Sequence, residues 1–126
     1  MSRFIKPEIV RLPLSHGDWI TVKKYLTAGE QRRAETRLLK AAPAGGLPQV
    51  NWELVQLSPV VEYLIDWSFV DDAGHPVPIR DMPADVVIDI LNSLDSDSFT
   101  EIVDALNAHV KAVAEEKKTR TTASVS

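Results

Sequence analysis

The sequence contains no cysteine among its 126 residues. Disulfide bonds, thiolate metal sites and a thiol nucleophile are therefore excluded, and the composition suits a reducing cytoplasm. Glycine is also sparse, with five residues in all. The pair Gly45-Gly46 has neither the following lysine nor the preceding strand of a phosphate-binding loop, so the sequence does not predict a nucleotide-dependent enzyme.

Long apolar runs are missing as well. No stretch approaches the roughly 20 apolar residues of a membrane span, and the start of the chain has no continuous apolar signal region. We therefore expect a soluble, unexported protein that does not bind membranes. The hydrophobic content of 44% and the charged content of 25% are ordinary globular values. They predict a single small domain over residues 1–115, followed by a disordered polar tail at residues 116–126.

Patterns for catalysis and metal binding are also absent from the sequence. Asp71, Asp72 and His75 lie close together, but this stretch lacks the alternating acids and terminal glutamate of a calcium-binding loop. His16 and His109 are interpreted as a turn residue and a helix residue, because neither has a partner at metal-ligand spacing. We therefore expect no catalytic residue, no cofactor, no metal site and no enzymatic activity.

The net charge of −4 hides an uneven distribution along the chain. Residues 1–40 contain nine Lys and Arg and four Asp and Glu, a net charge of +5, whereas residues 62–104 contain one Arg and eleven acids, a net charge of −10. Opposite charges on two parts of one molecule predict weak, salt-sensitive homo-oligomers. The acidic segment also argues against a nucleic-acid partner. Alternatively, both segments simply form solvated helix faces.

The densest apolar stretch, residues 58–80, contains Trp67, one of the three tryptophans, and is expected to form the core. Ser58 followed by Pro59 predicts the start of a helix, because serine caps free backbone donors and proline suits the first turn. Gly74 suits the positive φ of a turn, and an extended arm follows at residues 77–79. The predicted helix has an apolar stripe, which consists of Val60, Val61, Leu64, Ile65 and Phe69.

The first forty residues predict a β-hairpin followed by a helix. Residues 9–14 and 19–22 favour strands, with Pro13 at an edge or near a strand end. Thr27 and Glu30 have the spacing of a capping box, and the helix is expected to continue to residue 42, before a loop at residues 43–48.

That helix contains the one basic patch of the sequence, formed by Arg32, Arg33 and Arg37. Arg33 and Arg37 are four residues apart, where like charges repel unless an acid or a partner intervenes. These three arginines are the predicted partner-binding residues. The alternative is a solvated face, with Glu30 and Glu35 neutralising the charge locally.

The rest of the chain predicts further helices. Asn51 is suited to cap a helical stretch leading into Ser58-Pro59, as either one kinked helix or two short ones. Asp81 is expected to cap the next helix, and Ser98 with Glu101 to form a capping box at the start of the last one. The apolar stripes of these two helices are expected either to pack on each other or to exceed what one core hides. The sequence therefore predicts an α+β fold that is mostly α, with an N-terminal β-hairpin followed by a small bundle of four to five helices.

The chain resembles the tail assembly chaperones of long-tailed bacteriophages and prophages over about residues 5–113. Three stretches carry the resemblance: R-L-P-L-S-H-G-D-W-I-T-V-K-K-Y-L-T-A-G-E-Q-R-R, then Y-L-I-D-W-S-F-V-D-D-A-G-H-P-V-P-I, and finally L-D-S-D-S-F-T-E-I-V-D-A-L-N-A-H. The resemblance implies a non-enzymatic protein of the bacterial host cytoplasm that binds the tape measure protein while the tail tube assembles. The family offers no active residues to transfer, and we expect Trp19, Trp67 and Gly74 to define the fold.

A virion structural component, such as a small tail or head-tail connector protein, is the alternative function. A chaperone is expected to be absent from purified virions, whereas a connector remains in them.

Overall fold

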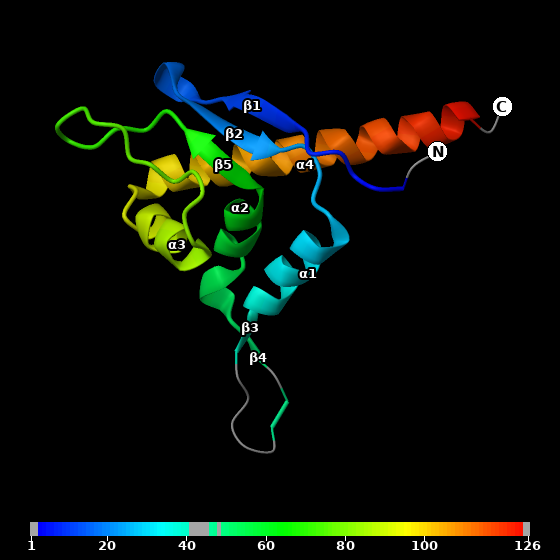
Figure 1. Cartoon of the computed structure of the whole chain (residues 1–126), viewed down its shortest axis with the longest axis horizontal. Helices are drawn as coiled ribbons and strands as arrows, with labels where there is room; N and C mark the ends of the chain where they lie inside the picture. Colours follow the sequence, from blue (N-terminus) through cyan, green and yellow to red (C-terminus); the bar gives the residue numbers. More distant parts are fainter. Residues whose placement is uncertain (1–2, 41–45, 48, 125–126) are drawn as a thin grey trace.

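The computed structural model describes residues 3–40, 46–47 and 49–124. Within these residues the fold is α+β and mostly helical, with a three-stranded antiparallel sheet in the order β1-β2-β5, as the sequence predicts for the class (Figure 1). The strands and helices are β1 (Ile9–Pro13), β2 (Trp19–Lys23), α1 (Ala28–Arg37), β3 (Leu39–Lys40), β4 (Gln49–Val50), α2 (Leu57–Tyr63), β5 (Leu64–Trp67), α3 (Ala84–Asn92) and α4 (Ser96–Ser124). Two 3-10 turns, Ser15–Gly17 and Trp52–Leu54, complete the described elements.

The predicted hairpin is confirmed. Strands β1 and β2 pair in register from Ile9 opposite Lys23 to Pro13 opposite Trp19. β1 is an edge strand, and Pro13 is its last residue, where a missing backbone donor costs no ladder bond. His16 has a φ of 58° in the connecting turn, consistent with its interpretation as a turn residue.

The predicted helix over residues 58–69 is wrong in its second half. Helix α2 ends at Tyr63, and Leu64–Trp67 forms strand β5, which pairs with β2 through Ile20 opposite Trp67 and Val22 opposite Leu64. The β-branched and aromatic residues of this run favour a strand, and the open edge of β2 supplies the backbone partners. The periodicity of a short apolar run does not distinguish a helix from a strand. Pairing with β2 therefore decides the conformation of this segment.

Ser58 is also not the helix cap that the sequence predicts. Helix α2 starts one residue earlier, and Ser58 is fully buried within it. Its hydroxyl donates a hydrogen bond of 2.7 Å to the carbonyl oxygen of Ala34, and so joins α2 to α1. The residue serves packing between helices instead of capping.

Local capping signals are confirmed at two other positions. Thr27 and Glu30 form the predicted capping box at the start of α1, and the Asn51 side chain accepts a hydrogen bond from the Glu53 amide. Helix α1 nevertheless ends at Arg37, five residues before the predicted end at residue 42, because residues 39–40 pair with residues 49–50 in a two-stranded ladder. Residues 41–42 of the predicted helix and residues 43–45 and 48 of the predicted 43–48 loop lie outside the described residues.

The starts of the last two helices differ from their predicted caps. Asp81 has a left-handed φ of 61°, whereas an N-cap needs extended backbone, and Pro83 occupies the N-cap position of α3. Asp95 caps the start of α4, accepting bonds of 3.0 Å from the Ser98 amide and 2.7 Å from its hydroxyl. Glu101 is therefore not part of a capping box with Ser98.

Helix α4 continues through residues 116–124, where the sequence predicts a disordered tail. This part of the chain contains neither glycine nor proline and begins with the strong helix formers Glu116 and Lys117. Figure 1 shows α4 crossing behind the sheet along the longest axis and extending past it on one side. The difference follows from local propensity, which sustains the helix without an apolar stripe.

The core lies between the sheet and helices α2, α3 and α4. The apolar stripes of α3 and α4 are largely buried in it, although Val86 and Val110 remain exposed. Most side chains of the two stripes therefore pack in the core and are not available on the surface. The buried core residues are Ile20, Val22, Leu57, Val60, Trp67, Ile79, Val87, Leu91, Ile102 and Leu106.

Candidate functional site

Two of the three predicted partner-binding arginines face a buried acid. Arg33 holds the Glu62 carboxylate with two hydrogen bonds, from Nε at 2.9 Å and from Nη2 at 3.2 Å. Arg37 donates from Nη2 to the same carboxylate at 2.8 Å. The side chain of Glu62 is only 4% exposed. This acid on α2 relieves the repulsion between the two arginines, so Glu30 and Glu35 are not needed for it.

The Glu62 carboxylate is ionised by its arginine partners. Burial by itself raises the pKa of this carboxyl, but the hydrogen bonds from Arg33 and Arg37, together with their positive charges, outweigh burial and hold the pKa below its ordinary value. The same contact raises the pKa of the Arg33 guanidinium. The cluster of Arg33, Arg37 and Glu62 is therefore a fixed, charged link between α1 and α2.

Arg37 also contacts Ser58, whose hydroxyl joins α2 to α1. Its Nη1 lies 3.1 Å from the hydroxyl oxygen of Ser58, which in turn bonds Ala34. The Arg37 side chain is 14% exposed, whereas that of Arg33 is 61% exposed. Arg37 is therefore structural, and Arg33 is the guanidinium of the cluster that meets solvent. Arg32 is exposed on α1 and does not join the cluster.

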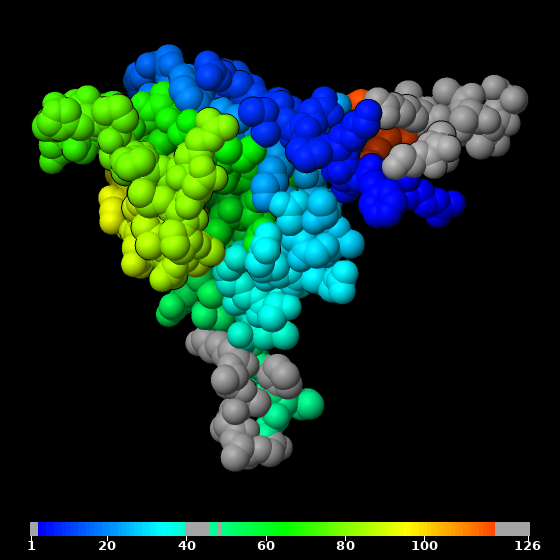
Figure 2. All heavy atoms as spheres, viewed as in Figure 1, coloured from blue at the N-terminus to red at the C-terminus, as the bar shows by residue number. Residues whose placement is uncertain are grey.

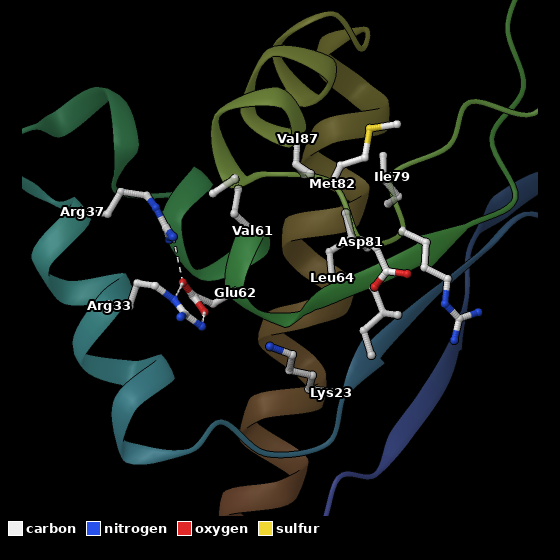
Figure 3. Close-up of a pocket in the computed structure, with 13 residues that line it drawn as sticks. Lys23, Arg33, Arg37, Val61, Glu62, Leu64, Ile79, Asp81, Met82 and Val87 are labelled. Carbon is white, nitrogen blue, oxygen red and sulfur yellow. Dashed lines mark hydrogen bonds and ion pairs between the residues drawn. The ribbon is translucent and has the colours of Figure 1, made fainter.

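A cavity of about 450 Å³ opens beside this cluster. Figure 2 shows the recess between the segment around residues 79–87, in yellow-green, and α1, in cyan. In Figure 3, Arg33 and Arg37 reach toward Glu62 from one side, and Ile79, Met82 and Val87 lie on the other. The lining consists of Lys23, Arg33, Arg37, Val61, Glu62, Leu64, Ile65, Ile79, Arg80, Asp81, Met82, Ala84 and Val87.

The other two cations of the lining, Lys23 and Arg80, have acidic partners of their own. Lys23 donates a hydrogen bond to Glu30. Burial raises the pKa of Glu30, but this contact lowers it, and the pKa lies below its ordinary value. Arg80 lies 4.0 Å from Asp66. Asp81 lines the cavity in its left-handed conformation, which few residues other than glycine adopt, so local backbone strain is located at the cavity wall.

The predicted fold-defining residues lie elsewhere in the molecule. Trp67 is 5% exposed, and its Nε1 donates a 2.8 Å bond to the carbonyl oxygen of Val77. Trp19 is half-buried beneath the Arg11 guanidinium, 3.9 Å from the ring centre. Gly74 has a φ of 82° in the predicted turn. Trp67 thus binds the arm that returns from this turn.

Sequence reasoning missed an exposed apolar surface around β3 and β4. The indole of Trp52 is 79% exposed, directly after the ladder that projects below α1 and α2 in Figure 1. Leu39 and Val50, register partners in this ladder, are also exposed, and exposed apolar side chains that lie side by side are typical of interaction sites. The signal in the sequence was a tryptophan beside a breaker cluster, outside any apolar stripe. We call this surface the β3–β4 patch; its exposed members are Leu39, Leu47, Val50, Trp52 and Val55.

Three further features are absent from the described residues. Within them, no group of three or more His, Cys, Asp or Glu side chains is arranged to hold a metal ion. Every buried side-chain nitrogen or oxygen in this part of the chain has a hydrogen-bond partner. No helix of the described ranges has both the length and the apolar character to cross a membrane.

The fold and these surfaces define a small α+β protein with a charged cavity and an apolar patch, both formed by α1, α2 and the segments next to them. Comparison with models of known protein families, with characterised proteins and with solved structures gives no match to this chain. The likeness to tail assembly chaperones therefore rests on the sequence motifs.

Proposed function

We propose that this protein is a phage tail assembly chaperone, a non-enzymatic protein that binds the tape measure protein in the bacterial host cytoplasm during tail tube assembly. The three stretches at residues 11–33, 63–79 and 94–109 support the family assignment. The exposed β3–β4 patch supports a binding role, and it is the one structural observation that carries this role.

The β3–β4 patch meets the physical demands on such a chaperone. A tape measure protein is a very long helical chain, and its apolar stripe aggregates unless it is covered before the tube forms. A cover that is later displaced must bind each segment modestly, through short contacts that are repeated along the partner. The exposed Trp52 indole and a few aliphatic side chains offer such a contact, whereas a large dry interface would resist displacement.

Co-expression tests this function. The tape measure protein of the same phage or prophage is produced with and without this chain, and its soluble fraction is measured. We expect higher solubility and a recovered complex with the parent protein, and a weaker effect with Trp52→Ala. Equal solubility with and without this chain, and no complex, would overturn the proposal.

Purified virions distinguish a chaperone from a structural component. We expect mass spectrometry to find no copies of this chain in mature particles. A fixed, symmetric copy number in the particle would instead assign it to the tail or the head-tail connector.

Weak self-association is a further part of the proposal. Four acids, Asp95, Asp97, Glu101 and Asp104, line one recess beside the start of α4. The basic residues Arg3, Lys6, Lys24 and Lys117 line another recess beside its far part, together with one acid, Glu8. Opposite charges at separated positions favour head-to-tail contacts that salt weakens. Sedimentation velocity at low and at high salt tests this, and identical distributions would exclude an electrostatic contact.

A further inference from the structure

The cluster of Arg33, Arg37 and Glu62 contains more positive than negative charge. Two guanidinium groups share one carboxylate, whereas Lys23 and Arg80, the other cations of the cavity, each have an acid nearby. The excess charge is therefore concentrated on the wall that α1 forms. The acid on the opposite wall, Asp81, does not contact either arginine of the cluster.

Arg33 presents this excess charge to solvent. It bonds Glu62 through Nε and Nη2, so within the described residues its Nη1 hydrogens are not engaged. Because Glu62 fixes the guanidinium plane, Nη1 is held in place before any ligand arrives. A carboxylate that reaches this atom gains a charge-assisted hydrogen bond without the entropic cost of ordering a long side chain.

The wall opposite Arg33 combines apolar side chains with Arg80 and Asp81. Ile79 and Val87 are buried at its base, and Met82 lies toward the opening. The cavity volume of about 450 Å³ lies within the range of small-ligand sites. A hydrated inorganic anion would leave these apolar side chains uncovered, whereas a ligand with an apolar body would cover them.

We propose that this cavity binds an acidic side chain of a protein partner together with the apolar residue beside it. The carboxylate bonds Arg33 Nη1, and the apolar group packs against Met82 and Val87. Naming the tape measure protein as that partner rests on the proposed function. The chemistry of the cavity itself does not depend on it.

Hexanoate is a probe with the required chemistry, since it joins a carboxylate to a short apolar chain. Nuclear magnetic resonance spectra of the full chain are recorded while hexanoate is added, with hexanol and inorganic phosphate as comparison ligands. A ligand of this size binds in about the millimolar range. We expect saturable shifts at Arg33 Nε and at the methyl groups of Val61, Met82 and Val87.

The comparison ligands distinguish the contribution of Arg33 to binding from that of the apolar side chains. We expect hexanoate to bind about tenfold more tightly than hexanol, because hexanol lacks the charge that Arg33 recognises. Phosphate is expected to leave the methyl signals unchanged. Equal affinity for hexanol and hexanoate would overturn the role of Arg33, and the absence of saturable shifts with hexanoate would overturn the site.

A matched pair of variants tests the assigned residue. Arg33→Gln is expected to weaken hexanoate binding about tenfold, whereas Arg32→Gln, on the same helix but outside the cavity, is expected to leave it unchanged. Equal weakening by both variants would show a general charge effect and overturn the proposal. If Arg33→Gln lowers the melting temperature sharply, the comparison of hexanoate with hexanol on the parent protein still decides. If the cavity binds hexanoate but co-expression does not change the solubility of the tape measure protein, the proposed function is overturned and the cavity proposal stands.

Discussion

The Glu101 carboxylate accepts two hydrogen bonds from Ser15, one from the main-chain amide at 2.8 Å and one from the hydroxyl at 2.9 Å. These residues lie 86 positions apart in the sequence. Ser15 lies in the turn between β1 and β2, and Glu101 lies in the first turns of α4. One carboxylate therefore fastens the hairpin turn to the longest helix.

Replacing Glu101 by alanine is expected to lower the free energy of unfolding by about 1 kcal/mol. The value is modest because both groups are near solvent, where water replaces part of the lost bonds. Denaturant unfolding measures the difference. Thr100→Ala, at the exposed neighbouring position, is the control and is expected to change stability by less than about 0.5 kcal/mol. A Glu101→Ala protein as stable as this control would show that the contact contributes nothing.

Replacing Glu62 by glutamine is expected to destabilise the fold by about 2 to 4 kcal/mol at neutral pH. Both guanidinium groups then lose their anionic partner, and Arg37 is mostly buried. Glu35→Gln, at an exposed site on α1, is the matched control and is expected to be nearly neutral.

The effect of Glu62→Gln is expected to depend on pH. The pKa of Glu62 is depressed in the folded protein, so its contribution is fully present above the ordinary carboxyl pKa of about 4.3 and is lost as pH falls through the lower folded value. Unfolding curves of parent and variant should therefore converge in strong acid. A stability difference that stays constant down to about pH 2 would assign the loss to shape and not to charge.

Trp67 and Trp52 offer a comparison of the same substitution at two sites. Trp67→Ala is expected to cost about 3 to 5 kcal/mol, because the buried indole packs on Phe69 with ring centres 4.9 Å apart and bonds Val77. Trp52→Ala is expected to change stability by less than about 0.5 kcal/mol. Thermal unfolding with circular dichroism measures both. Similar melting temperatures for the two variants would contradict the assigned difference in burial.

Gly74 and Gly29 form a second matched pair. Gly74→Ala is expected to destabilise by about 1 kcal/mol, since its φ of 82° strains any residue with a Cβ, although the space around it is open. Gly29→Ala, inside α1, is expected to stabilise by up to about 1 kcal/mol, because alanine favours the helix and its Cβ would lie 4.0 Å from Thr27 Oγ1. Chemical denaturation of both variants checks the opposite signs; a stabilising Gly74→Ala would overturn the turn assignment.

The sequence predicted those elements whose signals are local. The capping box of Thr27 and Glu30 and the hairpin around His16 depend on residues within a few positions of each other, and both are confirmed. The last capping box failed because Asp95, three residues upstream of Ser98, offers a competing acceptor, while Ser15 occupies Glu101. No local pattern distinguishes these two outcomes.

The candidate site required contacts that the sequence does not specify. The spacing of Arg33 and Arg37 correctly indicated that an acid or a partner must separate them. Which acid it would be depended on how α1 packs on α2, and the chain offers eighteen Asp and Glu. Strand β5 was missed for a similar reason, because Leu64–Trp67 becomes a strand only when the edge of β2 lies beside it.

The order of strands in the sheet has a consequence for how the chain emerges from the ribosome. Strand β2 acquires one neighbour immediately through a short hairpin, but its other neighbour, β5, is synthesised only after α1 and α2. Until then, β2 presents an unpaired edge that carries Ile20 and Val22, both of which are buried in the finished fold. A nascent chain stalled before Leu64 therefore exposes an aggregation-prone edge, and completion of the sheet is delayed until synthesis passes Trp67.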